Sequence, residues 1–231
     1  MSNPDRLIIT LDGPAGSGKS TVARRLAKRL GLEFLDTGAM YRGLAVRVLD
    51  RGIDPDTEDY AVVELARHQP MRFDWTTDPP RLYVGEVDVT DRLRDSDVSG
   101  LVSPVATIGG VRSVLVEAQR RIGREHPKLV TEGRDQGSVV FPDADAKFYL
   151  DANTQVRAHR RAEQIKAAGR HADLEEIRQQ IMSRDHRDST RIHAPLTCPE
   201  DAERIDTSEL SLEEVVDLLA QRVAKKVGLR A

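Results

Sequence analysis

The sequence has little cysteine and few aromatic residues: one cysteine, Cys198, and 4% aromatics among 231 residues. A single cysteine cannot form an intramolecular disulfide or hold a metal cluster, and we interpret Cys198, which lies beside Pro199, as incidental. No window approaches the roughly 18 uninterrupted apolar residues of a membrane helix. The first six residues contain no signal-peptide core. We therefore expect a cytoplasmic protein without a membrane partner.

An excess of positive charge is missing as well, because the formal net charge is −3. General nucleic-acid binders usually carry a basic surplus, so we expect no nucleic-acid partner. Arginine is still concentrated at residues 157–161 and 184–191, although most of these side chains could belong to solvated helix faces. With 39% apolar and 32% charged residues, the composition is that of a globular protein. The length fits a single domain, residues 1–231, with insertions.

The most informative motif is Gly-Pro-Ala-Gly-Ser-Gly-Lys-Ser at residues 13–20, which follows the apolar run 7–11. A loop that wraps a phosphate needs inward-pointing N–H groups, and glycines allow the backbone to approach closely. Lys19 supplies a positive charge for the β- and γ-phosphates, and Ser20 supplies a hydroxyl for Mg²⁺. The amphipathic helix predicted over 22–30 directs its positive end at the anion. A glycine-rich turn with a chance Lys-Ser is the alternative, but strand, spacing and helix together favour a nucleoside triphosphate site.

Further apolar patterns predict an α/β fold. Strands are expected at residues 32–35, 129–135, 146–151 and 203–207, which together with residues 7–11 make a five-stranded parallel sheet flanked by helices. Helix starts are expected at Asp36 or Thr37, Thr154, Asp173 and Ser211, and an apolar helical stripe covers 111–122. Residues 53–60 are expected to form a loop.

A small antiparallel insertion is predicted outside this sheet. The apolar period changes to two from Met71 to Trp75, and a two-residue turn at 85–86 places Val84 opposite Val87. This insertion could form the wall of a substrate pocket or be a surface elaboration, and the pattern alone leaves both possibilities open.

A second group of charged residues has the chemistry of an acceptor site. Arg134 and Asp135 lie at the C-terminal end of the predicted strand at 129–135, at the sheet edge where open α/β proteins bind ligands. Arg184, Asp188 and Arg191 are spaced to share one helix face, which suits a phosphate and a sugar hydroxyl. The alternative for these three residues is an exposed ladder of salt bridges.

Together these features resemble the bacterial-type cytidylate kinases, which are nucleoside monophosphate kinases with a P-loop core. The resemblance covers nearly the whole chain and rests on five blocks: Gly13-Pro14-Ala15-Gly16-Ser17-Gly18-Lys19-Ser20-Thr21, Asp36-Thr37-Gly38-Ala39-Met40-Tyr41-Arg42, Gly133-Arg134-Asp135-Gln136-Gly137-Ser138-Val139-Val140-Phe141-Pro142-Asp143-Ala144, Arg157-Ala158-His159-Arg160-Arg161 and Arg184-Asp185-His186-Arg187-Asp188. The Gly-Arg-Asp-x-Gly block and a long hairpin insertion at roughly 57–103 separate this group from adenylate kinases, which share the loop and the core.

The resemblance implies a β-containing insertion that binds the nucleoside monophosphate, at about residues 36–112, and a short helical lid at about 154–191. The small, polar connection 168–171 could be the hinge of this lid. The implied reaction transfers the γ-phosphoryl group of ATP to CMP or dCMP with Mg²⁺ as cofactor. Small nucleotides are then the partners, and a monomer is the expected state. No covalent enzyme intermediate is needed, because the acceptor phosphate is itself the nucleophile.

Individual roles carry over onto matching positions of this sequence. The donor ATP is expected to be held by Gly13, Pro14, Ala15, Gly16, Ser17, Gly18, Lys19, Ser20 and Thr21. The acceptor nucleotide is expected to contact Thr37, Arg42, Ser103, Arg112, Arg134, Asp135, Arg184, Asp188 and Arg191. Within this set, Arg42, Arg134 and Arg191 hold the phosphate, Arg184 and Asp188 the ribose, and Ser103, Arg112 and Asp135 the cytosine. The expected catalytic residues are Lys19, Arg134, Arg157, which closes over the triphosphate, and Arg191. Mg²⁺ is expected at Ser20 and, through water, at Glu132.

Two positions depart from the family pattern. Glu132 stands where the family often has Asp, so a longer arm reaches the Mg²⁺ shell. Gln136 replaces the usual aliphatic residue or Met, which could alter the floor of the base pocket. The rival functions are a kinase for another small acceptor, such as shikimate or a different nucleotide, and a nucleotide-dependent switch. The ranking of CMP, dCMP and UMP stays open.

Overall fold

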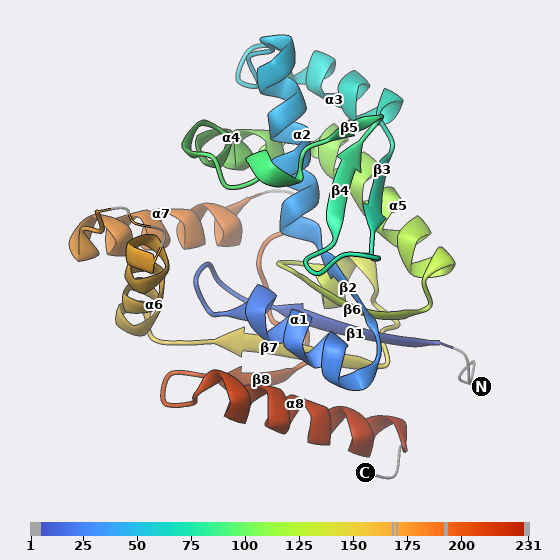
Figure 1. Ribbon diagram of the computed structural model, residues 1–231, viewed down its shortest axis with the longest axis vertical. Helices are drawn as coiled ribbons and strands as arrows, with labels where there is room; N and C mark the ends of the chain where they lie inside the picture. The colour runs from blue at the N-terminus through green and yellow to red at the C-terminus, as the bar shows by residue number, and fades with distance from the viewer. Residues whose placement is uncertain (1–5, 168, 170, 192–193, 229–231) are drawn as a thin grey trace. The chain divides into compact units, whose positions relative to one another are not determined.

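The computed structural model describes residues 6–167, 169, 171–191 and 194–228. The chain divides into two compact units, Met1–Leu35 with Pro127–Ala231 and Asp36–His126, and each is described by itself (Figure 1). Ala168 and Arg170 of the expected hinge lie outside the described residues. The insertion at 36–112 and the lid at 154–191 stay predictions as functional parts.

The first unit is built on the expected five-stranded parallel sheet. Its strands are β1 (Leu7–Asp12), β2 (Glu33–Asp36), β6 (Lys128–Gly133), β7 (Ala146–Asp151) and β8 (Glu203–Asp206), in the order β2-β6-β1-β7-β8. The central strand β1 pairs in parallel with β6 and with β7, so that Asp12 lies beside Gly133 on one side and Tyr149 on the other. Because parallel strands end at the same sheet edge, the segments after β1, β6 and β7 leave from one place.

Helices α1 (Lys19–Leu30) and α8 (Leu212–Val227) pack on this sheet, and α6 (Thr154–Ala167) pairs with α7 (Leu174–Thr190). The main core joins α1, the sheet and α8 through buried side chains such as Leu26, Phe148 and Leu219. Because α1 and α8 bury apolar stripes while their other faces stay polar, each helix has the amphipathic pattern that core packing requires. A smaller apolar cluster holds α6 to α7.

Three local predictions in this unit need adjustment. The start of α6 is capped by Asn153, whose side chain accepts a hydrogen bond from the Gln155 N–H at 2.8 Å, and Thr154 is the first helical residue. Helix α7 ends at Thr190, so Arg191 is its extended C-cap residue and not part of the helical face. A one-turn π-helix, η2 (Gln136–Val140), follows β6 where no helix was predicted.

The second unit contains the expected hairpin within a helical frame. Strands β3 (Met71–Asp74), β4 (Arg81–Val84) and β5 (Val87–Asp88) form an antiparallel sheet in which Val84 faces Val87. Its helices are α2 (Thr37–Arg51), α3 (Asp59–His68), α4 (Ser96–Thr107) and α5 (Gly109–Glu125), with a short 3₁₀ turn, η1 (Thr90–Arg92). Helix α4 was not predicted, and α3 begins inside the segment expected to be a loop.

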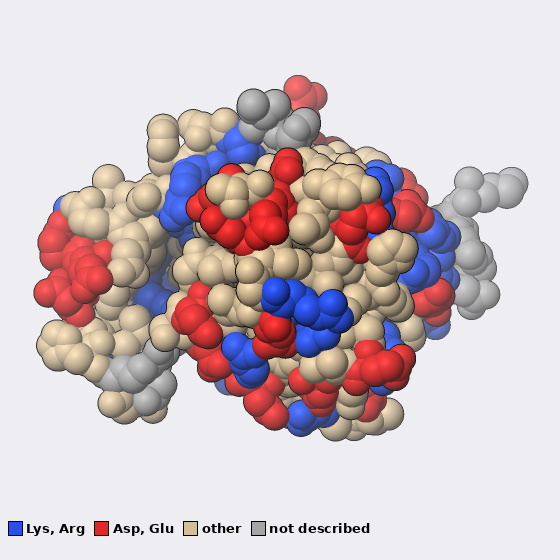
Figure 2. Space-filling model, turned by 90° about the horizontal axis from the view of Figure 1, so that it is seen from above, with Lys and Arg blue, Asp and Glu red and all other residues tan. Residues whose placement is uncertain are grey.

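Acidic and basic side chains lie close together over the face seen in Figure 2. In the second unit, Arg92 and Asp50 form a partly exposed ion pair at 2.6 Å. Across the residues that the structure describes, no single helix is long and apolar enough to cross a membrane. Helices α4 and α5 taken together pass by length and composition, and they are bent by 96°.

Candidate functional site

The loop between β1 and α1 has the backbone geometry of an anion cradle. Gly13, Gly16 and Gly18 have φ angles of 144°, 77° and 86°, a region that favours glycine,. A Cβ on Gly13 would also collide with the carbonyl oxygen of Leu150. The loop therefore needs glycine both for its turns and for its close approach to β7, and it ends at the N-terminus of α1, where backbone N–H groups favour an anion.

Lys19 is buried beneath this loop. Its ammonium donates hydrogen bonds to the carbonyl oxygen of Pro14 at 2.7 Å and to the Ser17 hydroxyl at 3.3 Å. Burial and the positive charges of Arg134 and Arg184 together lower the pKa of Lys19 to about 7, although the negative charge of Glu132 acts in the opposite direction. The hydrogen bonds to Pro14 and Ser17 therefore hold the Lys19 side chain at the loop.

Ser20 and Glu132 meet at the ends of α1 and β6. The Ser20 hydroxyl donates to a carboxylate oxygen of Glu132 at 2.7 Å, although the two residues are 112 positions apart. A hydroxyl and a carboxylate beside a phosphate cradle are hard oxygen ligands of the type that Mg²⁺ prefers, with substrate phosphates completing the shell. The two residues expected at the metal are therefore brought together.

Asp12 is a buried residue of the site that the sequence analysis missed. One of its carboxylate oxygens accepts from the Gln136 N–H at 2.9 Å and the other from the Gly137 N–H at 2.7 Å. Burial raises the pKa of Asp12 to about 7, although both N–H groups act in the opposite direction. The carboxylate fixes the turn that follows Arg134 and Asp135 to the end of β1.

Gln136 lies in the interior and not at an exposed surface. Its side-chain oxygen accepts a hydrogen bond from the Thr131 hydroxyl at 2.8 Å, and the residue is buried. The position that departs from the family pattern thus extends the polar network around Asp12. The expected effect on the floor of a base pocket stays a prediction.

The arginines of the first unit gather around Asp188. Its carboxylate accepts from Nε of Arg134 at 2.8 Å, and Arg184 and Arg191 each lie 4.0 Å from it. Although burial opposes the charged form, these arginines lower the pKa of Asp188. Four residues predicted for the acceptor site therefore form one cluster that joins the end of β6 to α7, and a fully exposed salt-bridge ladder does not describe it.

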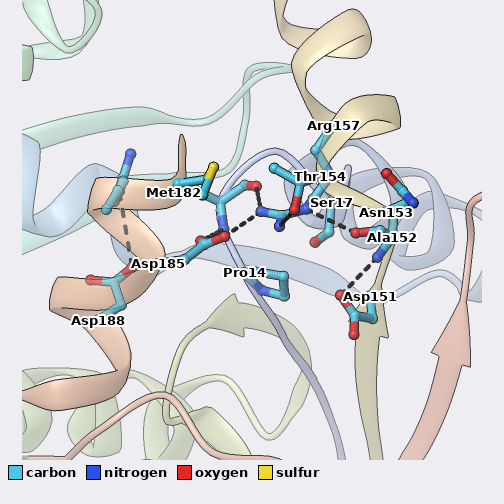
Figure 3. A network of polar contacts seen from close by, with 12 residues as sticks. Pro14, Ser17, Asp151, Ala152, Asn153, Thr154, Arg157, Met182, Asp185 and Asp188 are labelled. Carbon is cyan, nitrogen blue, oxygen red and sulfur yellow. Dashed lines mark hydrogen bonds and ion pairs between the residues drawn. The ribbon is translucent and has the colours of Figure 1, made fainter. Parts of the chain in front are cut away.

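Arg157 is locked in place by α6, α7 and the phosphate-binding loop. It donates to the carbonyl oxygens of Ala152 at 2.9 Å and of Ala15 at 2.8 Å, and to the Thr154 hydroxyl at 3.0 Å. Its Nη1 also contacts a carboxylate oxygen of Asp185 at 2.5 Å (Figure 3). In this state the guanidinium holds protein groups, and its expected contact with a triphosphate stays a prediction.

An open cavity of about 740 Å³ lies beside this network, at the ends of β7 and β8. Arg157 belongs both to its wall and to the contacts with the loop, which places the cavity next to the phosphate cradle. The lining residues are Asp151, Ala152, Asn153, Thr154, Arg157, Arg204 and Asp206.

Four expected acceptor-site residues belong to the second unit. Thr37 is buried at the start of α2, and Arg42, one turn further, lies 4.0 Å from Asp36. Arg112 is buried in α5 with its guanidinium 5.7 Å from the ring centre of Tyr41. Ser103 is half-buried in α4, and Asp135 is buried in the first unit. The roles of Ser103, Arg112 and Asp135 in reading cytosine stay predictions. So do those of Thr37 and Arg42 in binding the acceptor nucleotide.

The chain is similar to known proteins over nearly its whole length. The family model described as "Cytidylate kinase" matches residues 9–225. A cytidylate kinase from Nocardia farcinica is 43% identical over 99% of this chain and 98% of its own length. One from Azotobacter vinelandii is 43% identical over 95% of this chain and 96% of its own length.

A solved structure of an uncharacterized protein from Eubacterium ventriosum aligns with a TM-score of 0.54 at 11% identity, covering 95% of this chain and 99% of that one. This likeness concerns the fold alone. The sequence relatives, in contrast, match from end to end, and this protein belongs to the cytidylate kinase family.

Proposed function

We propose that this protein transfers the γ-phosphoryl group of ATP to the 5′-phosphate of CMP or dCMP, which gives ADP and CDP or dCDP. It is a nucleoside monophosphate kinase by family. The observation that carries the proposal is the cluster of Arg134, Arg184 and Arg191 around Asp188, near enough to Lys19 for Arg134 and Arg184 to lower its pKa. The phosphate-binding loop suits the triphosphate of the donor ATP, and the arginine cluster suits the phosphate of the acceptor nucleotide.

The protein needs no nucleophile of its own for this reaction. An ionised acceptor phosphate attacks the γ-phosphorus, and the ADP oxygen leaves on the opposite side. The protein therefore acts by positioning two anions and by stabilising the charge that spreads over the migrating group. Lys19, Arg134 and Arg191 are the proposed sources of positive charge, together with Arg157, which closes over the triphosphate, while the lid helices α6 and α7 exclude water.

Ser20 and Glu132 are the residues proposed to hold Mg²⁺, directly through the hydroxyl and through water at the carboxylate. When bound, Mg²⁺ neutralises charge on the β- and γ-phosphates. Their 2.7 Å contact supports the pair, because the same two oxygens can turn to a shared cation,.

The cavity at the ends of β7 and β8 is the proposed place of the donor nucleoside. Arg157 connects this cavity to Ala15 of the loop, so a triphosphate in the cradle would direct its nucleoside there. The acceptor nucleotide is assigned to Thr37 and Arg42 of the second unit, together with the arginine cluster.

Cytosine selection is assigned to Asp135, with Ser103 and Arg112. A carboxylate accepts a hydrogen bond from the 4-amino group of cytosine, whereas uracil presents an oxygen there and faces the carboxylate with repulsion. We propose that the protein acts as a monomer in the cytoplasm on these small nucleotides.

The test is the release of ADP from ATP and Mg²⁺ with CMP, dCMP, UMP, AMP, GMP and shikimate supplied in turn. We expect rapid release with CMP or dCMP and none with shikimate. Lys19→Met should abolish transfer, with Lys28→Met, at an exposed position of α1, as the matched control. ADP release that does not depend on any acceptor would instead indicate a switch or a hydrolase.

Asp135→Ala provides a separate test of base reading. We expect the KM for CMP to rise by about 10-fold to 200-fold, as for the loss of a contact worth 1–3 kcal/mol, with little change in the KM for ATP. Equal losses for both nucleotides would contradict the assignment of Asp135 to the base.

A further inference from the structure

We propose that Asp185 is a positioning residue for phosphoryl transfer, which fixes helix α7 and the arginines attached to it to the backbone of the phosphate-binding loop. The inference rests on the proposed function and deepens it. Asp185 is not among the residues assigned to ATP, CMP or Mg²⁺ above. Its role follows from contacts between segments that are far apart in the sequence.

The carboxylate of Asp185 connects the loop to both lid helices. Its Oδ1 accepts from the N–H of Ala15 at 3.0 Å, and its Oδ2 accepts from Nη1 of Arg157 at 2.5 Å. The same Nη1 donates to the carbonyl oxygen of Ala15 at 2.8 Å. Both backbone groups of Ala15 are therefore bound by charged side chains, one from α6 and one from α7. Charge-assisted hydrogen bonds of this kind are stronger than neutral ones.

The partner of Asp185 has little freedom to move. Arg157 is buried, and its other nitrogens bind the Ala152 carbonyl oxygen and the Thr154 hydroxyl at the start of α6. Figure 3 shows Asp185 and Arg157 pointing at each other in the centre of this network. Because the guanidinium is fixed from three sides, the carboxylate that binds it defines one position for α7 along the loop.

The acceptor arginines depend on the same stretch of α7. Asp188 lies three residues beyond Asp185, and residues three apart are neighbours on a helix surface. Asp188 binds Arg134 at 2.8 Å and has Arg184 and Arg191 at 4.0 Å. One helical turn thus touches the donor loop through Asp185 and orders the acceptor arginines through Asp188.

A shift of this turn should affect transfer more than binding. Each cradle could still hold its nucleotide, but the attacking oxygen would no longer lie in line with the γ-phosphorus, and a displacement of about 1 Å can cost about 100-fold in rate. A looser lid would also admit water, which attacks the γ-phosphorus and releases inorganic phosphate and ADP.

Asp185→Asn is the sharpest substitution. The amide oxygen can keep the contact with the Ala15 N–H, while the amide NH₂ meets the guanidinium of Arg157 as donor against donor and the ion pair is lost. The matched control is Glu175→Gln, which removes an exposed carboxylate from the same helix, where it pairs with Arg178. Melting temperatures of both variants show whether they fold.

The experiment measures ADP, CDP and inorganic phosphate in one reaction with ATP, CMP and Mg²⁺, and relates kcat to the number of nucleotide-binding sites found by titration with ADP. Wild type tests the proposed function first, because it must form one CDP for each ADP. For Asp185→Asn we expect kcat per binding site to fall by about 10-fold to 100-fold and the ratio of phosphate to CDP to rise.

If Asp185 had a merely structural role, the substitution would lower the melting temperature and the number of binding sites. It would leave kcat per binding site and the ratio of phosphate to CDP unchanged. The inference is overturned if Asp185→Asn matches Glu175→Gln in kcat per site and in the ratio of phosphate to CDP. If wild type forms no CDP, the proposed function fails first. If Asp185→Asn does not fold, Asp185→Glu replaces it, because a carboxylate one methylene longer keeps the charge but displaces α7, and unchanged coupling in that variant also overturns the inference.

Discussion

At the scale of a single residue, the protonation of Lys19 depends on its surroundings in the fold and on the charge of a bound ligand. Its ammonium has two acceptors in the loop, yet burial and the neighbouring arginines lower its pKa to about 7. A triphosphate brings negative charge to the same place, and negative charge favours the protonated form. The free protein therefore holds a lysine that is ready to gain a proton.

We expect nucleotide binding at about pH 8 to take up a proton, approaching about one per site, because the bound phosphates raise the pKa of Lys19 from its low value. Calorimetric titration with ADP in buffers of different ionisation enthalpy measures this number. Lys19→Met should remove most of the uptake, and Lys28→Met should keep it. Binding enthalpies that do not depend on the buffer in wild type would contradict the assignment.

Sequence spacing identified the residues of the phosphate-binding loop because they act within one short segment. Asp12 and Asp185 escaped the same analysis, since their partners lie 124 and 170 positions away. Nothing in the local sequence distinguishes an aspartate that binds a distant backbone N–H group from one that is exposed to solvent, when it lies at a strand end or on a polar helix face. Only the packing of β1, η2 and α7 gives these carboxylates their roles.

At the scale of elements, the strands could be predicted from the sequence, whereas helices α3 and α4 could not. A strand buried on both faces tends to be an apolar run, which marks β1 most clearly, whereas β6 and β7 also contain polar residues such as Thr131 and Lys147,. Helix α4 contains Gly100 and Pro104, which disfavour helix, so propensity argues against it,. Val98, Val102 and Val105 are nevertheless buried, and the packing of α4 against α2 and α5 overrides the weak local preference.

Two glycines in helices, Gly43 and Gly100, allow the effect of side-chain packing on stability to be measured apart from the effect of helix propensity. A Cβ on Gly43 of α2 would lie 2.9 Å from Leu82 and 3.1 Å from Val84, whereas a Cβ on Gly100 of α4 would meet nothing within 4 Å. We expect Gly43→Ala to lower the free energy of unfolding by about 1–3 kcal/mol. Gly100→Ala should raise it by about 0.5–1 kcal/mol. Urea denaturation measures both, and a change of the same sign in the two variants would contradict this account of how α2 packs on the hairpin.

At the scale of the whole molecule, the account requires two anion sites that work on one reaction. The first unit holds the phosphate-binding loop and the cluster of Arg134, Arg184 and Arg191, while the parts of Arg42 and Arg112 in acceptor binding stay predictions. The family resemblance could name these residues from short motifs. It could not show that Asp188 collects three arginines or that α7 touches the loop, because both depend on how separate elements pack.

The most direct measurement follows the phosphorus-31 spectrum of the protein with ATP, CMP and Mg²⁺. The account predicts that the γ-phosphorus signal of ATP falls while the β-phosphorus signal of CDP rises by the same amount, without a matching rise of inorganic phosphate. Loss of the γ-phosphorus into inorganic phosphate alone, or an unchanged spectrum in the presence of CMP, would contradict it.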